Sequence, residues 1–113
     1  MLTIYHNSRC RKSRETLALI EEARAEVQVV EYLKDIPSAD ELKGLLAKLG
    51  IPAEKLLRKN EAIFKEQFKG KALSEEEWVE AMIQNPKLIE RPIVVKGDKA
   101  VLGRPPEQVK ELL

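Results

Sequence analysis

The start of the chain alternates two short runs of β-forming residues with one helical pattern, and this order limits the fold most strongly. Leu2–Tyr5 is an extended run that ends in a polar turn. Leu17, Ile20 and Ala23 then recur at helical spacing. Residues 27–32 form a second β-rich run. Two strands that flank one helix favour a right-handed crossover with the strands parallel. The sequence therefore predicts an α/β fold.

The middle of the chain is predicted to be helical. Ser38 with Glu41 is a capping-box pair that marks a helix start, and Gly50 is placed to end that helix. Ser74 with Glu77 marks the start of a second helix in the same way. The residues between these helices are mixed in character, and we expect short helical pieces there.

The end of the chain predicts a hairpin and a last helix. Residues 92–95 and 100–102 are two short β-forming runs. Gly97 and Asp98 between them suit a tight hairpin turn. A pair of prolines then opens a helix, since the first helical N–H needs no partner. No repeat or linker interrupts the chain, so we expect a single domain over residues 1–113.

Composition excludes several classes of function. The chain has 20 Lys plus Arg against 19 Asp plus Glu, a net charge of +1, so no broad field for nucleic acid or membranes is expected. No apolar run approaches the roughly 20 residues that span a bilayer, and the start does not resemble a signal peptide. We therefore expect a cytoplasmic protein. One Cys and one His cannot form an internal disulfide or an ordinary zinc site, so no metal is expected.

Cys10 lies between the end of the first predicted strand and the start of the first predicted helix. A free thiol, with a pKa of about 8.5, is mostly protonated at neutral pH, and only the thiolate is a good nucleophile. Backbone N–H groups and the positive end of the helix dipole favour the thiolate at this position. Nearby side chains add positive charge, namely Arg9, Arg11, Lys12 and Arg14. The turn therefore indicates a reactive cysteine.

Three polar residues of the same turn are candidates for supporting the thiolate. Ser13, one helical turn after Cys10, can donate a hydrogen bond to the sulfur. His6 and Asn7 can order the turn or hold the thiolate directly. We therefore assign these three residues a supporting role.

Cys10 is the only cysteine in the chain. Any oxidised or covalent species that forms on it must be resolved by a thiol from another molecule. Glutathione or a dithiol protein is therefore an implied partner.

Several stretches resemble the ArsC family of arsenate reductases, a branch of the thioredoxin- and glutaredoxin-like proteins. Residues 4–14 resemble the family's opening, in which a strand ends in His-Asn before a Cys-x-x-Ser turn. Residues 90–95 resemble the segment in which an arginine precedes a cis proline, and residues 103–105 resemble the arginine that follows the hairpin. Residues 56–59 resemble the arginine of the family's helical insertion. The likeness implies a thioredoxin-like mixed sheet with an inserted helical segment at about 38–86.

The resemblance implies roles for four residues. Cys10 is the nucleophile, and Arg58, Arg91 and Arg104 bind the oxyanion. Arsenate is a dianion near neutral pH and repels a thiolate unless cations neutralise its oxygens. Planar guanidinium groups do this with paired hydrogen bonds. The resemblance also implies reduction of arsenate to arsenite with glutathione as co-substrate and glutaredoxin as partner, and with no bound cofactor.

Two other functions stay open. A related thiol oxidoreductase could act on another oxyanion or on glutathionylated substrates, and the added charges of Arg9, Arg11 and Lys12 favour it. A regulator similar to Spx would instead bind RNA polymerase. Such regulators commonly sense redox state through Cys-x-x-Cys, and Ser13 stands here in place of the second cysteine.

Overall fold

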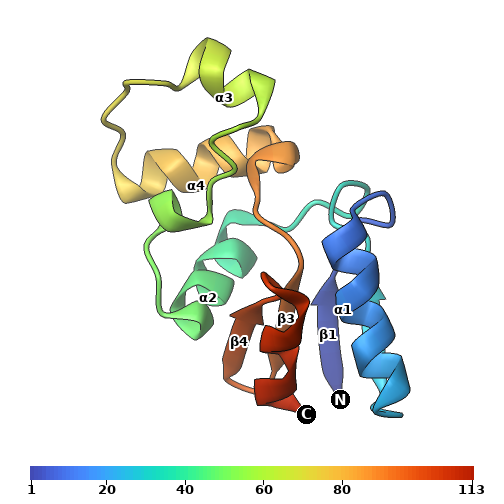
Figure 1. Ribbon diagram of the computed structural model, residues 1–113. Helices are drawn as coiled ribbons and strands as arrows, with labels where there is room; N and C mark the ends of the chain where they lie inside the picture. Colours follow the sequence, from blue (N-terminus) through green and yellow to red (C-terminus); the bar gives the residue numbers. More distant parts are fainter. The chain divides into compact units, whose positions relative to one another are not determined.

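The computed structural model describes residues 1–113, which form two compact units (Figure 1). The first unit is discontinuous and contains Met1–Asp35 and Arg91–Leu113. The second unit is the continuous segment Ile36–Glu90. The helical insertion expected at about 38–86 falls inside this second unit. No helix in the chain is long and apolar enough to cross a membrane.

The first unit is built on a four-stranded mixed sheet with the strand order β2-β1-β3-β4. Its strands are β1 (Leu2–Tyr5), β2 (Val27–Val30), β3 (Ile93–Lys96) and β4 (Lys99–Leu102). β1 pairs parallel with β2 and antiparallel with β3, and β3 pairs antiparallel with β4. The predicted parallel pair and the predicted hairpin are both confirmed. The hairpin turn consists of Gly97 and Asp98, and Gly97 takes the left-handed conformation with φ 62°.

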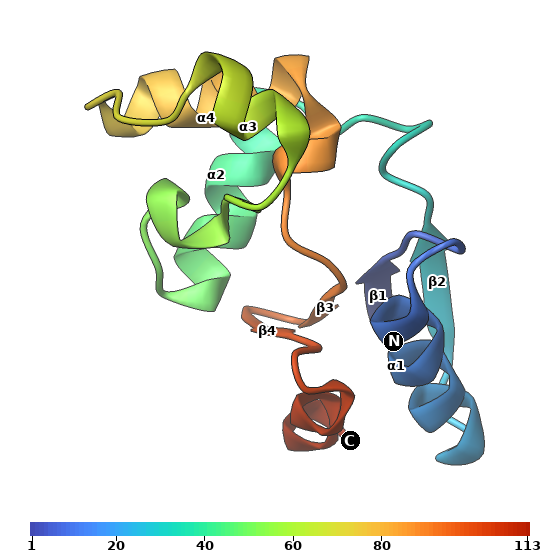
Figure 2. The same cartoon turned by 45° about the horizontal axis from the view of Figure 1, so that its top comes forward.

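Two helices lie on the same face of this sheet (Figures 1 and 2). They are α1 (Arg11–Glu22) and a C-terminal 3₁₀ helix, η3 (Pro106–Leu112). Both contribute to one apolar core, whose buried members are Leu2, Ile4, Ile20, Val94, Val109 and Leu112. The sequence predicted a last helix, which takes the 3₁₀ form, and its buried residues match that form. Pro106, Val109 and Leu112 recur every third residue, the period at which a 3₁₀ helix stacks side chains on one side.

The pairing register brings four chain segments to one edge of the sheet. Tyr5, the last residue of β1, pairs with Val30, the last residue of β2. Tyr5 also pairs with Ile93, the first residue of β3. Ile93 in turn pairs with Leu102, the last residue of β4. The residues that follow β1, β2 and β4, and those that precede β3, therefore meet at this edge.

The second unit is helical. It contains α2 (Ala39–Leu49), η1 (Ala53–Leu56), α3 (Ala62–Gln67), α4 (Glu75–Gln84) and η2 (Pro86–Leu88), of which η1 and η2 are 3₁₀ helices. Ser38 caps the start of α2, since its hydroxyl accepts a bond from the Glu41 N–H, and Gly50 in the left-handed conformation caps the end. At α4, Ser74 and Glu77 form the reciprocal capping box that the sequence predicted.

Packing within the second unit centres on α4. This helix contacts α2 and both 3₁₀ helices. Trp78 of α4 lies against Phe64 and Phe68, with ring centroids 6.3 Å and 6.0 Å away. An isolated antiparallel bridge pairs Leu57, which follows η1, with Ile89, which follows η2. The second unit therefore has its own buried contacts.

Replacing Ile20 by alanine tests the core of the first unit. Ile20 has no exposed surface, so Ile20→Ala is expected to lower the free energy of unfolding by about 2–5 kcal/mol. Urea denaturation followed by far-ultraviolet circular dichroism measures this loss. Ile36→Ala is the matched control, because Ile36 is 49% exposed and its truncation should change stability little. Equal losses in the two variants would contradict this description of the core.

Candidate active site around Cys10

Cys10 is the N-cap residue of α1, as the sequence predicted. Its backbone is extended, with φ −94° and ψ 121°, and its N–H donates to the Asn7 carbonyl at 2.9 Å. Its carbonyl oxygen accepts the Arg14 N–H at 3.0 Å and so starts the helical ladder. The thiol therefore lies at the end of the helix where the N–H groups of the first turn lack intrahelical partners.

Ser13 holds the turn together through its hydroxyl group. Ser13 Oγ lies 2.6 Å from His6 Nδ1 and accepts the Asn7 N–H at 3.1 Å. The sequence led us to expect a bond from this hydroxyl to the Cys10 sulfur. In the structure the hydroxyl is engaged by His6 and Asn7, and the backbone N–H of Ser13 is the group that bonds the sulfur. Ser13 and His6 are both buried, which fixes the shape of the turn.

Arg91 and Arg104 come to Cys10 from the two open ends of the β3–β4 hairpin. Arg104 Nη2 donates to Cys10 Sγ at 3.8 Å, and Arg104 Nε donates to the Arg91 carbonyl at 2.7 Å. The Arg91–Pro92 peptide bond is cis, as the family resemblance implied. Two of the three predicted oxyanion-binding arginines are thus brought to the predicted nucleophile within one unit.

Gly103 allows this close approach. A Cβ atom at this position would lie 2.5 Å from Thr16 Oγ1 and 2.7 Å from Pro92 Cγ. The Gly103 N–H donates to the Pro92 carbonyl at 2.9 Å, which fastens the end of β4 to the start of β3. Because no other residue lacks a Cβ, only glycine fits between α1 and the cis proline while leaving Arg104 beside the sulfur.

The surroundings of Cys10 favour its thiolate. Partial burial acts to raise the pKa of the Cys10 thiol, but three groups outweigh it. The backbone N–H of Ser13 bonds the sulfur, and the guanidinium groups of Arg91 and Arg104 add positive charge, so the pKa of Cys10 lies below its ordinary value. The site therefore favours the thiolate, the form in which a cysteine is a good nucleophile.

Tyr32 is a site residue that sequence reasoning did not identify. It lies in a turn after β2, is 1% exposed and contacts Arg91. Burial acts to lower the pKa of Arg91, but the Cys10 thiolate and the Tyr32 phenol act against it, and the net pKa is raised. The available signal was an aromatic residue at the end of the β-rich run, which the sequence reading placed in the strand.

Arg58 belongs to the second unit, and its guanidinium is engaged there. Arg58 Nη1 donates to Glu90 Oε1 at 3.0 Å, and Arg58 Nε lies 3.6 Å from Glu61 Oε1. The Arg58 side chain is 14% exposed, so two carboxylates balance a largely buried charge. The sequence predicted Arg58 as an oxyanion ligand but did not identify these acidic partners.

The remaining cations of the turn are exposed. Arg11 pairs with Glu15 at 2.8 Å, and Arg14 donates to the Ser8 carbonyl at 3.0 Å. Arg9 and Lys12 are exposed as well, and the structure contains no ion pair for either side chain. The charge nearest the sulfur therefore comes from the hairpin arginines, which are distant in sequence.

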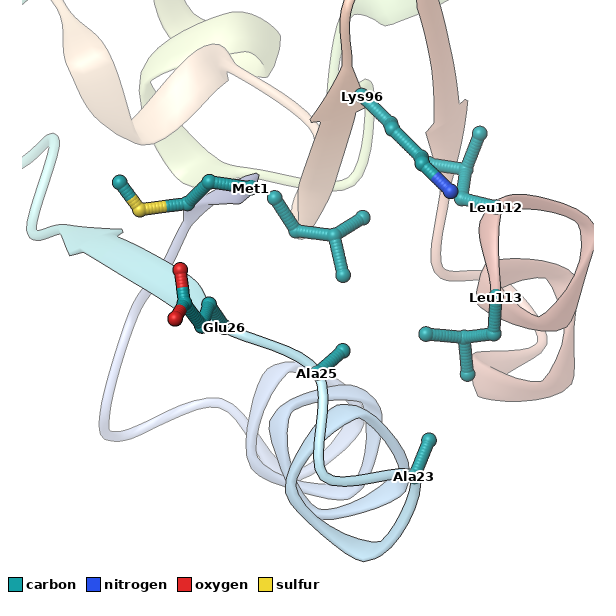
Figure 3. A pocket seen from close by; sticks show the side chains of 8 residues that line it. Met1, Ala23, Ala25, Glu26, Lys96, Leu112 and Leu113 are labelled. Atoms are coloured by element: carbon teal, nitrogen blue, oxygen red, sulfur yellow. The ribbon is translucent and has the colours of Figure 1, made fainter.

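Two clefts lie at opposite ends of the sheet of the first unit. The larger, of about 330 Å³, lies beside the start of β1 and has Glu26 and Lys96 on opposite sides (Figure 3). It is otherwise mostly apolar and is remote from Cys10. The smaller, of about 250 Å³, is lined by residues of the Cys10 turn and of the turn after β2. No three metal-ligating side chains are grouped together in the chain.

The chain is similar to proteins of one family over nearly its whole length. A family model described as the ArsC family matches residues 5–112. An Escherichia coli K12 protein named "Uncharacterized protein YfgD" is 51% identical over 97% of this chain and 94% of its own. An arsenate reductase of Haemophilus influenzae is 43% identical over 97% of each chain. The solved structure of an arsenate reductase from Vibrio cholerae is 48% identical and has a TM-score of 0.95, covering 99% of this chain and 97% of that one. The predicted thioredoxin-like fold is therefore confirmed.

Removing the arginines should shift the titration of Cys10. Burial alone raises the pKa of the thiol, so Arg91→Gln or Arg104→Gln is expected to move the pKa of Cys10 upward. The rate of alkylation by iodoacetamide, measured against pH, reports the thiolate fraction because Cys10 is the only cysteine. Lys12→Gln is the control and should leave the curve in place. An unchanged curve in both arginine variants would refute this electrostatic account.

His6 should titrate in acid, with two neighbours acting in opposite directions. Burial lowers the pKa of His6, while Glu31 raises it and Arg14 lowers it. We therefore expect Glu31→Gln to lower the pKa of His6 further and Arg14→Gln to raise it. Because the chain has a single histidine, the two ring C–H signals in an NMR titration both report His6, and the measurement is unambiguous. A wild-type pKa above the ordinary 6.5, or shifts of the same sign in the two variants, would show that the description is wrong.

Proposed function

The chain belongs to the ArsC family, and from that premise we propose that it reduces arsenate through one nucleophilic cysteine, Cys10. The proposal is supported most directly by one observation, the approach of Arg91 and Arg104 to the same sulfur. It is also supported by relatives that are named arsenate reductase, among them the 43% identical protein of Haemophilus influenzae.

Two arginines at a thiolate suit attack on an oxyanion. A thiolate and a dianion repel each other, and fixed guanidinium groups offset this repulsion without reorganising during the reaction. Each guanidinium presents several N–H donors in a planar fork, so it can contact sulfur and oxygen atoms at the same time. Arg91 Nε is buried without a hydrogen-bond partner in the structure, and an unsatisfied buried donor costs about 1–3 kcal/mol. These features support binding of an anion beside Cys10.

The proposed reaction needs two thiols. The Cys10 sulfur forms a bond to arsenic, and one arsenate oxygen leaves as water. Overall, arsenate and two thiols give arsenite, one disulfide and one water, because arsenic gains two electrons and each sulfur loses one. Cys10 supplies one thiol, and the second must come from another molecule because the chain has no other cysteine.

We propose glutathione as the second thiol and glutaredoxin as the protein that completes the cycle. The single cysteine of the chain supports a reductant of this kind, since a resolving cysteine in the same chain is not available. No resident metal or nucleotide takes part in the proposed reaction.

Arg58 is proposed as a third oxyanion ligand because of the resemblance of its segment to the family. Within its own unit, Glu61 and Glu90 balance its charge. Binding of an oxyanion by Arg58 therefore requires exchange with at least one of these carboxylates. This requirement distinguishes Arg58 from Arg91 and Arg104, which already contact the sulfur.

Replacing Cys10 by serine tests the reaction and the residue together. Arsenate reduction, measured as arsenite formed in the presence of glutathione and glutaredoxin, is expected to fall to the level without enzyme in Cys10→Ser. A serine hydroxyl stays protonated at neutral pH and cannot replace the thiolate. Lys12→Gln is the control and should retain most of the activity. Full activity in Cys10→Ser would overturn the assignment of the nucleophile.

Measuring the reaction of Cys10 with glutathione disulfide beside arsenite formation distinguishes a related thiol oxidoreductase from an arsenate reductase. If the wild-type protein forms no arsenite but its Cys10 forms a mixed disulfide with glutathione disulfide, the related thiol oxidoreductase function is supported instead. The exposed side chains of Arg9 and Lys12 are the observation that favours that alternative.

A further inference from the structure

A second polar cleft lies directly beside the Cys10 turn. It encloses about 250 Å³ and is lined by His6, Asn7, Ser8, Arg9, Glu31, Leu33 and Lys34. The parallel pairing of β1 and β2 explains why these two segments meet, since the His6 N–H continues the pairing to the Val30 carbonyl at 2.8 Å. The wall is close to the nucleophile, because Arg9 precedes Cys10 and the Asn7 carbonyl accepts the Cys10 N–H.

The cleft carries two positive charges and one negative charge. Arg9 and Lys34 supply the cations, and Glu31 supplies the carboxylate. Lys34 Nζ lies 3.6 Å from Glu31 Oε2, and the two side chains are 80% and 45% exposed. An exposed pair of this kind contributes little stability, so both partners can exchange onto a ligand. The Arg9 side chain has no ion pair in the structure.

We propose that this cleft binds the charged groups of a peptide thiol of the glutathione class, which acts as co-substrate for Cys10. This inference rests on the proposed function, since it assigns a place to the second thiol. Such a tripeptide carries two carboxylates and one ammonium group, the complement of Arg9, Lys34 and Glu31. Charge complementarity of this kind selects a partner and orients it.

The size of the cleft fits one end of the tripeptide. Complete small-molecule sites enclose about 300–1,000 Å³, and this cleft lies just below that range. The γ-glutamyl end, which carries the ammonium group and one carboxylate, therefore fills the cleft, and the glycyl carboxylate reaches the second cation at its rim. The cysteinyl thiol between the two ends stays outside the cleft, next to the turn that holds Cys10. The cleft makes and breaks no bond. Its role is to bind and orient the thiol.

The same charges argue against the oxyanion as the occupant. Arsenate near neutral pH is a dianion without a positive group, and Glu31 would repel it. The hairpin arginines offer an anion two guanidinium groups at the sulfur instead. The two substrates therefore have separate places around Cys10.

Binding of S-methylglutathione tests the cleft without any reaction, because this ligand keeps the three charged groups but has no free thiol. Isothermal titration calorimetry is expected to show about 3- to 5-fold weaker binding for Arg9→Gln and for Lys34→Gln, because an exposed charge pair contributes only modestly to binding. The double variant should bind at least about 10-fold more weakly, since the two side chains are expected to contribute independently. Lys12→Gln is the matched control, because Lys12 is an exposed cation of the same turn that does not line the cleft.

Three results would overturn the proposal. The first is wild-type affinity for S-methylglutathione in the Arg9→Gln/Lys34→Gln double variant. The second is absence of binding to the wild-type protein, and the third is an equal loss in Lys12→Gln. A ligand analogue that lacks the ammonium group provides a further check, because Glu31→Gln should not weaken its binding, since the carboxylate only repels it and pairs with Lys34, while binding of S-methylglutathione weakens.

Kinetic measurements separate this proposal from the proposed function. If both are right, the double variant raises the KM for glutathione and leaves the KM for arsenate unchanged. If the wild-type protein binds S-methylglutathione in the cleft but reduces no arsenate, the cleft assignment stands and the arsenate assignment falls. If arsenate is reduced with an unchanged KM for glutathione in the double variant, the reverse holds.

Discussion

The antiparallel pairing of β3 with β1 is the contact on which the rest of the first unit depends. It joins two chain segments that are separated by the whole of the second unit, and it sets the register that places residue 91 beside the end of β1. The β3–β4 hairpin then returns the chain to the same edge and delivers Arg104. A shift of one residue in this register would turn each side chain to the other face of the sheet.

The site balances burial against charge. A half-buried thiolate loses hydration, and two guanidinium groups with one backbone N–H compensate for that loss. Arg91 carries a similar cost, which the Cys10 thiolate and the Tyr32 phenol offset. The charged groups therefore stabilise one another, and the removal of any one leaves the others less well compensated. This dependence couples the hairpin, the turn after β2 and the N-terminus of α1.

Local signals predicted the parts of the fold that local interactions determine. The capping box at Ser74, the glycine that ends α2 and the Gly97–Asp98 turn all depend on residues within a few positions of one another. The pairing of His6 with Ser13 was not predictable in the same way. It depends on how the polar turn folds relative to α1. A hydroxyl group can hydrogen-bond to a sulfur or to an imidazole, so the residue type alone does not show which partner Ser13 takes.

Contacts between distant residues were harder to derive. The resemblance to the family named Arg91 and Arg104, and the sheet register explains why they meet at Cys10. Of the carboxylates beside Arg58, Glu61 stands only three residues further on, whereas Glu90 comes from the far end of the same unit and no spacing in the sequence connects it with Arg58. The cleft formed by Arg9 and Lys34 likewise requires the parallel pairing of β1 with β2 before the two turns become neighbours.

The discontinuous first unit has a consequence for the order in which the protein matures on the ribosome. The continuous helical unit, residues 36–90, is synthesised before the hairpin and η3, and domains generally fold as units during synthesis. Val109 and Leu112 belong to the core of the first unit, so that core cannot close until η3 has emerged. Until then Cys10 lacks both hairpin arginines, two of the groups that lower the pKa of its thiol. Synthesis of the β3–β4 hairpin therefore lowers the pKa of the cysteine, and a nascent chain that has not yet reached the hairpin carries a less reactive thiol.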